Sequence, residues 1–290
     1  MNLAERFKDN CGFGLLAHIR NIPSHQLLKD AIQSLSRMMH RGAVSADGKT
    51  GDGCGLLCSM PVGFMRKVAE QQGLSLPDQF AIATLFLSDE EKQLGIFREQ
   101  CEKNDLIISL VREVPLDTDA LGEYALSMLP KIVQVFVVPA ALIATRRFDA
   151  LVYLTRKEVE RQLADDADFY IPSFSRSMIS YKGLVMPHYI AKLYPDLQSE
   201  DFQISFAMFH QRFSTNTLPQ WKLAQPLRNI AHNGEINSIQ GNRFKALNKF
   251  TDVDSPVFSK QELEQMLPLL ENGVSDSANL DNMVEFLLAN

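Results

Sequence analysis

The sequence lacks any run of apolar residues that could cross a membrane, and it lacks an excess of positive charge. A transmembrane helix needs about 20 consecutive, mostly apolar residues, and no stretch of the 290 residues approaches this. The formal net charge of -6 at pH 7 gives no electrostatic attraction to nucleic acid or to an anionic membrane surface. We therefore expect neither partner and favour chemistry on a small molecule.

Cysteines are also few, and none has the spacing of a zinc site. The four are Cys11, Cys54, Cys58 and Cys101, and the histidines offer no pair at metal-ligand spacing either. Residues 1–10 are mostly polar and have no apolar core, so they do not read as a secretory signal. These features predict free thiols, no metal and a cytoplasmic, reducing compartment.

A hydrophobic content of 46% is enough for one large core or two modest ones. The apolar periodicity predicts a mixed α and β fold with no internal repeat. Ser24 stands where it could cap the first helix, and Gly42 where it could end it. The expected strands are 12–19, 55–60, 80–87, 106–111, 132–138 and 204–209, with a hairpin from 169–174 and 177–181; the expected helices are 27–39, 63–72, 90–103, 121–129, 146–163, 236–247, 259–267 and 280–288.

Cys11 heads the run Cys-Gly-Phe-Gly-Leu-Leu-Ala-His. Cleavage after Asn10 would make it the first residue, with a thiol as nucleophile and its own α-amino group as base. That amine has a reference pKa of roughly 7.7–8.0, so it can accept a proton near neutral pH. The alternative is that Cys11 is a small buried apolar residue at the start of a strand.

Asn233 and Gly234 could supply two neighbouring hydrogen-bond donors. The Asn233 amide and the Gly234 backbone N–H suit the oxyanion that forms when a thiol attacks an amide carbonyl. The same dipeptide is also typical of a simple turn.

Arg212 and Asp276 are candidates for binding the two charges of an α-amino acid. The guanidinium of Arg212 can bind a carboxylate through two hydrogen bonds, and Thr215 and Asn216 add polar groups to the same loop. Asp276 could accept from an ammonium group. The alternatives are a surface ion pair for Arg212 and a helix cap for Asp276.

Arg41 falls at the end of the first expected helix, where a cation is favourable without any function. Residues 50–55, Thr-Gly-Asp-Gly-Cys-Gly, lack the lysine and spacing of a P-loop. We interpret them as a tight turn that brings backbone close to the site.

Eight short motifs occur in an order that resembles the N-terminal class II glutamine amidotransferase domain of the large subunit of the bacterial, NADPH-type glutamate synthase family. Together they span nearly the whole chain. They are Asn10-Cys11-Gly12-Phe13-Gly14, His40-Arg41-Gly42-Ala43, Thr50-Gly51-Asp52-Gly53-Cys54-Gly55, Tyr181-Lys182-Gly183, Gln211-Arg212-Phe213-Ser214-Thr215-Asn216-Thr217, Ala224-Gln225-Pro226, Ala231-His232-Asn233-Gly234-Glu235-Ile236-Asn237 and Ser275-Asp276-Ser277.

The resemblance implies an α+β, N-terminal-nucleophile hydrolase fold, with two stacked antiparallel sheets between helical layers (αββα). It implies that residues 1–10 are a propeptide and that 11–290 are the amidotransferase domain. The family's domain continues past the position of Asn290, so the resemblance also implies a fold truncated at its C-terminus.

The resemblance further implies a role for each candidate residue. L-glutamine would be hydrolysed to L-glutamate and ammonia through a thioester on the cysteine. The roles would be nucleophile for Cys11, oxyanion hole for Asn233 and Gly234, carboxylate binding for Arg212 with Thr215 nearby, ammonium binding for Asp276, and positioning of the cysteine terminus for Arg41.

In the complete enzyme of this family, the ammonia reacts with 2-oxoglutarate to give a second glutamate. That step implies further synthase domains with FMN and an iron–sulfur cluster, and a small reductase subunit with NADPH and FAD, none of which has a counterpart in these residues. Two alternatives stay open: a non-catalytic, unprocessed or truncated module, and a class II amidotransferase that makes an amino sugar, asparagine or phosphoribosylamine. The long insert at 64–180 and the Gly-Glu-Ile-Asn run after Asn233 favour glutamate synthase.

Overall fold

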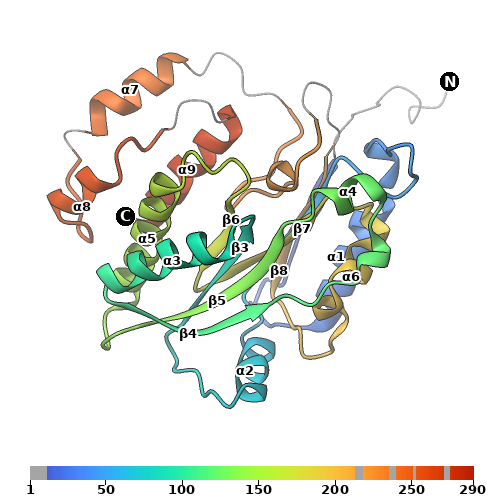
Figure 1. Cartoon of the computed structure of the whole chain (residues 1–290), viewed down its shortest axis with the longest axis horizontal. Coiled ribbons are helices and arrows are strands. Elements are labelled where there is room, and N and C mark those ends of the chain that lie inside the picture. Colours follow the sequence, from blue (N-terminus) through green and yellow to red (C-terminus); the bar gives the residue numbers. More distant parts are fainter. Residues whose placement is uncertain (1–11, 213–217, 235–239, 251–252, 271–274) are drawn as a thin grey trace. The chain divides into compact units, whose positions relative to one another are not determined.

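A computed structural model describes residues 12–212, 218–234, 240–250, 253–270 and 275–290. The chain divides into two compact units, each containing one four-stranded sheet (Figure 1). The predicted mixture of helices and antiparallel strands is confirmed. Unit 1 comprises Met1–Ser75, Glu113–Pro130 and Met178–Gly234, and unit 2 comprises Leu76–Arg112, Lys131–Ser177 and Glu235–Asn290.

The sheet of unit 1 has the strand order β1-β8-β2-β7. β8 pairs antiparallel with β1 on one side and with β2 on the other, and β2 pairs antiparallel with β7. The sheet therefore joins strands that are far apart in the chain, and β8 is an interior strand. The bounds are Gly12–Ala17 for β1, Cys54–Ser59 for β2, Met178–Gly183 for β7 and Phe206–Gln211 for β8.

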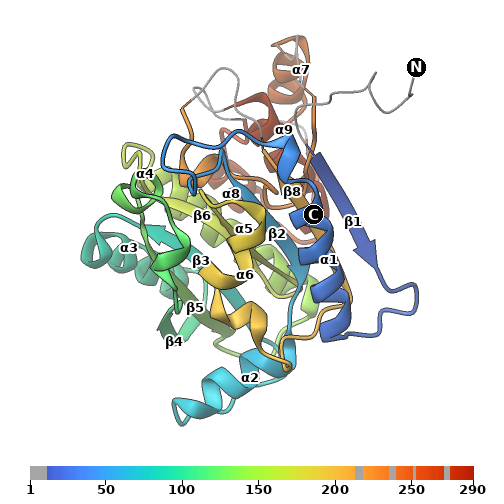
Figure 2. The same ribbon diagram turned by 90° about the vertical axis from the view of Figure 1, so that its right-hand side faces the viewer.

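Helix α1, His25–Arg37, runs beside β1 and β8 (Figure 2). Ser24 caps it as predicted, because its Oγ accepts from the backbone N–H of Leu27 at 3.2 Å. The helix ends earlier than predicted. A separate 3₁₀ turn, Met39–Arg41, follows, and Gly42 ends that turn rather than the helix.

The other helices of unit 1 are short. They follow strands or lie in the loops between them. They are α2, Val62–Gln71, α4, Glu123–Ser127, and α6, Ile190–Leu193, with 3₁₀ turns at Thr118–Ala120, Pro187–Tyr189, Pro195–Gln198 and Trp221–Leu223.

The sheet of unit 2 has the order β4-β5-β3-β6. β3 pairs antiparallel with both β5 and β6, and every residue of β3 is buried. Apart from Thr84 its residues are all apolar, which suits a strand covered on both faces. The bounds are Ala81–Leu87 for β3, Leu106–Glu113 for β4, Lys131–Pro139 for β5 and Tyr170–Ser175 for β6; the helices are α3, Glu90–Lys103, α5, Thr145–Gln162, α7, Gln240–Phe250, α8, Lys260–Gln265, and α9, Asp276–Ala289.

Helix α5 is the centre of unit 2 because it is buried on two faces. Phe148 and Val152 belong to an apolar cluster with the sheet, whereas Tyr153 and Leu154 pack with residues of α7, α8 and α9. Arg156 on the same helix is fully buried and pairs with Glu285 of α9 at 2.7 Å and with Glu160. Its charge is thus neutralised where it has lost water.

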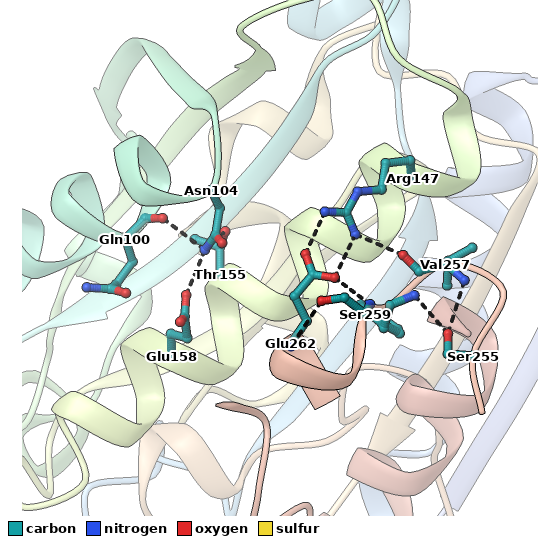
Figure 3. A network of polar contacts seen from close by, with 10 residues as sticks. Gln100, Asn104, Arg147, Thr155, Glu158, Ser255, Val257, Ser259 and Glu262 are labelled. Atoms are coloured by element: carbon teal, nitrogen blue, oxygen red, sulfur yellow. Dashed lines mark hydrogen bonds and ion pairs between the residues drawn. The ribbon is translucent and has the colours of Figure 1, made fainter. Parts of the chain in front are cut away.

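Polar side chains also tie α5 to neighbouring segments (Figure 3). The Asn104 amide donates to Thr155 at 3.1 Å and to Glu158 at 2.7 Å. Near the N-terminus of the helix, Arg147 donates to the carbonyl of Val257 at 2.8 Å and to the carboxylate of Glu262. Both ends of α5 are therefore held by specific polar contacts as well as by packing.

One predicted supersecondary element is wrong. The expected hairpin of 169–174 and 177–181 is two strands that belong to different sheets: β6 pairs with β3, and β7 pairs with β2. Both segments contain strand-forming residues such as Ile171 and Tyr181, but this composition does not specify the partner. Among the described residues, no helix combines the length and hydrophobicity needed to cross a bilayer.

Candidate active site

Strand β8 delivers a polar sequence, His210, Gln211 and Arg212, to one end of the first sheet. Gln211 is the register partner of Gly12 on one side and of Cys54 on the other. The residue that follows Cys11 in the chain therefore pairs with the residue that precedes Arg212. Cys11 itself lies outside the described residues.

Arg41 lies beside Gly12. A Cβ atom built on Gly12 would stand 3.5 Å from Cγ of Arg41 and 2.8 Å from Sδ of Met38. The Nε of Arg41 donates to Nε2 of His40 at 3.1 Å. The turn after α1 thus brings the side-chain stem of Arg41 next to the first described residue of β1.

Backbone contacts fix Arg212 from two sides. Its N–H donates to the carbonyl of Gly53 at 2.9 Å, and its carbonyl accepts from the side-chain amide of Gln211 at 3.0 Å. Gly53 has φ +115°, a conformation that glycine adopts without steric cost. The glycine-rich segment 50–55 therefore brings its backbone to a predicted site residue as expected, but it holds a bend at Asp52 and the start of β2 rather than a tight turn.

Gly42 is required by the same arrangement. A Cβ atom there would lie 1.9 Å from Nε2 of Gln211 and 3.1 Å from the carbonyl oxygen of Arg212. The side chain of Gln211 thus passes directly over Gly42. Two predicted motifs that are far apart in the sequence, one with Arg41 and one with Arg212, are in contact through it.

Asn233 and Gly234 form an exposed bend, and among the described residues no atom lies within 4 Å of a Cβ built on Gly234. The residue before them is held firmly. The carbonyl of His232 contacts Nε2 of His210 at 2.9 Å, and its backbone N–H donates to Oε1 of Gln225 at 3.2 Å. The bend is therefore open to solvent while its base is anchored to β8 and to a loop.

His210 is fully buried, and this burial lowers its pKa to about 4. The imidazole is then neutral at neutral pH and carries one ring proton. Because a carbonyl oxygen can only accept, we assign that proton to Nε2.

Lys182 of β7 holds the loop that contains Gln225. Its buried ammonium donates to the carbonyl of Ala224 at 2.8 Å, and to those of Lys222 and Pro226 at 3.4 Å. The loop also contains a cis peptide bond between Gln225 and Pro226. Carbonyl oxygens thereby replace the water that a buried ammonium group loses.

Asp276 belongs to unit 2, and the contacts that follow are all within that unit. The cap hypothesis is wrong for it: the cap of α9 is Ser275, whose Oγ accepts from the N–H of Ala278 at 3.1 Å. Asp276 is the first helical residue, and its Oδ1 accepts from Arg243 at 2.7 Å. A carboxylate has about four acceptor positions, so this ion pair leaves capacity for a further donor. Thr215, the other predicted binding residue, lies outside the described residues.

The three described cysteines are free and buried. Burial raises the pKa of Cys54, and it raises those of Cys58 and Cys101 to about 12. Cys54 also donates to the carbonyl of Val185 at 3.2 Å. A thiol with so high a pKa is a poor nucleophile near neutral pH, so none of these three competes with Cys11 for that role.

Sequence reasoning assigned no role to His210, Gln225 or Lys182. All three are polar, and two of them interrupt apolar strands. Lys182 and Gln225 stand within motifs that the sequence analysis had singled out. A polar residue within a strand or a motif was therefore the sequence signal for these positions. Only the fold shows which carbonyl or amide each side chain contacts.

Comparison with known proteins gives a consistent result. The family described as glutamine amidotransferases class-II matches residues 11–290. Ferredoxin-dependent glutamate synthase of Cyanidium caldarium is 39% identical, covering 97% of this chain and 19% of that protein. The large chains of NADPH glutamate synthase from Azospirillum brasilense and Bacillus subtilis are each 35% identical, again covering 97% of this chain and 19% of theirs. The chain thus spans about a fifth of the length of these relatives.

Proposed function

The chain belongs to the class II glutamine amidotransferases, and from that premise we propose that it hydrolyses L-glutamine with Cys11 as an N-terminal nucleophile. The observation that carries the proposal is the meeting of Gly12, Arg41 and Arg212 at one end of the first sheet. The residue after the nucleophile thereby lies close to two arginine residues. A carboxylate substrate would be attracted to the same place.

In the proposed reaction, removal of residues 1–10 frees the α-amino group of Cys11. The thiol gives its proton to that amine and attacks the side-chain amide carbon of glutamine. Asn233 and Gly234 donate hydrogen bonds to the resulting oxyanion. The intermediate collapses as the leaving nitrogen takes the proton and departs as ammonia, and water then hydrolyses the thioester to glutamate and the free thiol.

Other residues bind the α-carboxylate and α-ammonium groups of glutamine. Arg212, with Thr215 nearby, binds the α-carboxylate, and Asp276 accepts from the α-ammonium. Arg41 positions the cysteine terminus. The proposed fold class is the four-layer αββα arrangement of N-terminal-nucleophile hydrolases.

The relatives' names suggest the fate of the ammonia. We propose that it is used with 2-oxoglutarate to make a second glutamate in a complete synthase. The FMN, iron–sulfur, NADPH and FAD chemistry of that step would lie in other domains and in a reductase subunit.

The test begins with the N-terminus. Mass spectrometry of the purified protein shows whether Cys11 is the first residue, and a glutaminase assay then compares the processed chain, Cys11→Ala and Cys101→Ala. We expect Cys11→Ala to abolish hydrolysis and Cys101→Ala, which also removes one thiol, to retain it.

A second comparison isolates the amine. A chain that retains residues 1–10 should be inactive, because the amide nitrogen of an internal cysteine cannot accept a proton as an amine does. Full turnover by Cys11→Ala would refute the mechanism. A processed chain that binds glutamine without turning it over would instead identify a non-catalytic binding module.

A further inference from the structure

The peptide groups of His232 are held on both sides, immediately before the two proposed oxyanion donors. Nε2 of His210 lies 2.9 Å from the carbonyl oxygen, and Oε1 of Gln225 lies 3.2 Å from the nitrogen. Asn233 and Gly234 themselves are exposed. The direction in which that bend points is therefore set largely by what holds its base.

His210 is a rigid support for this purpose. It pairs in register with Phe13 of β1 and with Gly55 of β2, so it sits on a strand that is bonded on both sides. Its imidazole is fully buried, and its Nδ1 has no hydrogen-bond partner in the part of the chain that the structure describes. A buried ring nitrogen without a hydrogen bond costs free energy. The hydrogen bond from Nε2 to the carbonyl of His232 offsets part of that cost.

The backbone of Gln225 packs against β2. A Cβ atom built on Gly55 would lie 2.9 Å from the carbonyl oxygen of Gln225, so the loop rests directly on β2. The ammonium of Lys182 binds the carbonyls on either side, those of Ala224 and Pro226. With its backbone fixed in this way, the side chain of Gln225 reaches the N–H of His232 from a defined position.

We infer that His210 and Gln225 are positioning residues for the oxyanion hole, which they orient by clamping the peptide groups of His232. The inference rests on the proposed function, because it assumes that Asn233 and Gly234 are the donors. Donors stabilise an oxyanion only when they are already aimed at it, and a misplacement of about 1 Å can cost about 10²-fold in rate. Neither positioning residue touches the substrate in this scheme.

The experiment uses a pair of amide substitutions at His210. In His210→Gln the side-chain nitrogen extends to about the reach of Nε2, whereas in His210→Asn it stops short near the position of Nδ1. Both variants are polar and uncharged. We expect His210→Asn to lower kcat for glutamine about 10- to 100-fold with KM within about threefold of wild type, and His210→Gln to stay within about fivefold in both.

Two controls separate positioning from general damage. His25→Leu removes another buried histidine, whose Nδ1 contacts the carbonyl of Phe202 at 3.2 Å, and it should leave kcat within about threefold. Alkylation of Cys11 by iodoacetamide forms no oxyanion, so its rate should be the same in His210→Asn and in wild type.

A double-mutant cycle completes the test. If His210 acts through the bend, adding His210→Asn to Asn233→Ala should cost much less than it costs in the wild type. An undiminished cost in the double variant, or a wild-type kcat in His210→Asn, would overturn the inference. If neither His210 variant folds, Gln225→Met and Gln225→Glu make the same comparison, since only the latter retains an acceptor for the His232 N–H.

These outcomes are distinct from failure of the proposed function. If processed wild type does not hydrolyse glutamine, or Cys11→Ala retains activity, the proposed function fails. If those two results come out as expected and the His210 and Gln225 variants keep kcat, only the inference about positioning fails.

Discussion

Substitution of Gly42 by alanine should disturb the contact between the turn after α1 and the end of β8. The added Cβ would lie 1.9 Å from Nε2 and 2.7 Å from Cδ of Gln211, and 3.1 Å from the carbonyl oxygen of Arg212. The first two distances are far below a normal van der Waals contact. The amide of Gln211 must therefore move away.

The cost can be estimated from what that movement breaks. Gln211 is fully buried, and its amide donates to the carbonyl of Arg212 at 3.0 Å. Loss of that bond in a buried site costs about 1–3 kcal/mol, and forcing extra volume into a packed region costs about 1–3 kcal/mol more. Since part of the strain relaxes, we expect Gly42→Ala to lower the free energy of unfolding by about 2–4 kcal/mol.

Urea unfolding followed by tryptophan fluorescence measures this directly. The chain has one tryptophan, Trp221, which is buried in the same unit as Gly42 and donates to the carbonyl of Ala125 at 3.1 Å. Gly63→Ala is the matched control, because no described atom lies within 4 Å of a Cβ there. It should change the stability by no more than about 1 kcal/mol.

In the glutaminase assay, Gly42→Ala should also raise KM, since Arg212 loses a contact that fixes its backbone. Equal unfolding midpoints for Gly42→Ala and wild type, with an unchanged KM, would refute the reasoning. They would mean that Gln211 does not pass over Gly42 in solution.

Four further predictions concern separate features. Asn233→Ala should lower kcat by about 10²–10³-fold with little change in KM, whereas Arg212→Lys should mainly raise KM. If steady-state kinetics show the reverse, Asn233 binds the ground-state substrate and Arg212 stabilises the transition state. Thiol titration of the folded, processed chain at pH 8 should find one fast-reacting cysteine, and in denaturant all four should react. Because the folded pKa of His210, about 4, is below its ordinary 6.5, the unfolded state binds more protons between those values. The free energy of unfolding should therefore fall as pH drops from 6.5 to 4, by up to about 1.4 kcal/mol per pH unit, and His210→Gln should reduce that slope in urea titrations at several pH values. Arg156→Leu strands the carboxylates that pair with it and should destabilise the chain by about 3–5 kcal/mol in calorimetry or urea unfolding, and a change below about 1 kcal/mol would contradict a buried ion pair.

The sequence predicted local structure well, because local signals determine it. Helix 90–103 was predicted with the bounds that α3 has, and the Ser24 cap follows from a side chain that reaches only three residues ahead. Strand pairing is different. The hairpin expected at 169–181 failed because β6 and β7 find partners far away in the chain, and no residue of the short connection dictates that choice.

The candidate site could likewise be predicted only in part. Motifs identified Arg41, Arg212 and the Asn233–Gly234 bend as parts of one site, and the fold of unit 1 brings the first two to one sheet end. The supports of the bend could not be predicted. That His210 faces the carbonyl of His232 depends on the path of a loop, which composition and spacing do not encode.

The position of β8 between β1 and β2 has a consequence for how the protein is made. β1 is an edge strand whose neighbour in the sheet is β8, and the ribosome must synthesise nearly all of the chain between them before the two can pair. At about 5–20 residues per second, that interval is on the order of 10–40 s. During it the N-terminal strand has no sheet to join, and a pairing so distant in the sequence is slow to form. Any proteolytic processing that requires β1 to be paired must therefore wait until β8 has been synthesised. Although β1 is made early, it is one of the last strands of its unit to take its place in the sheet.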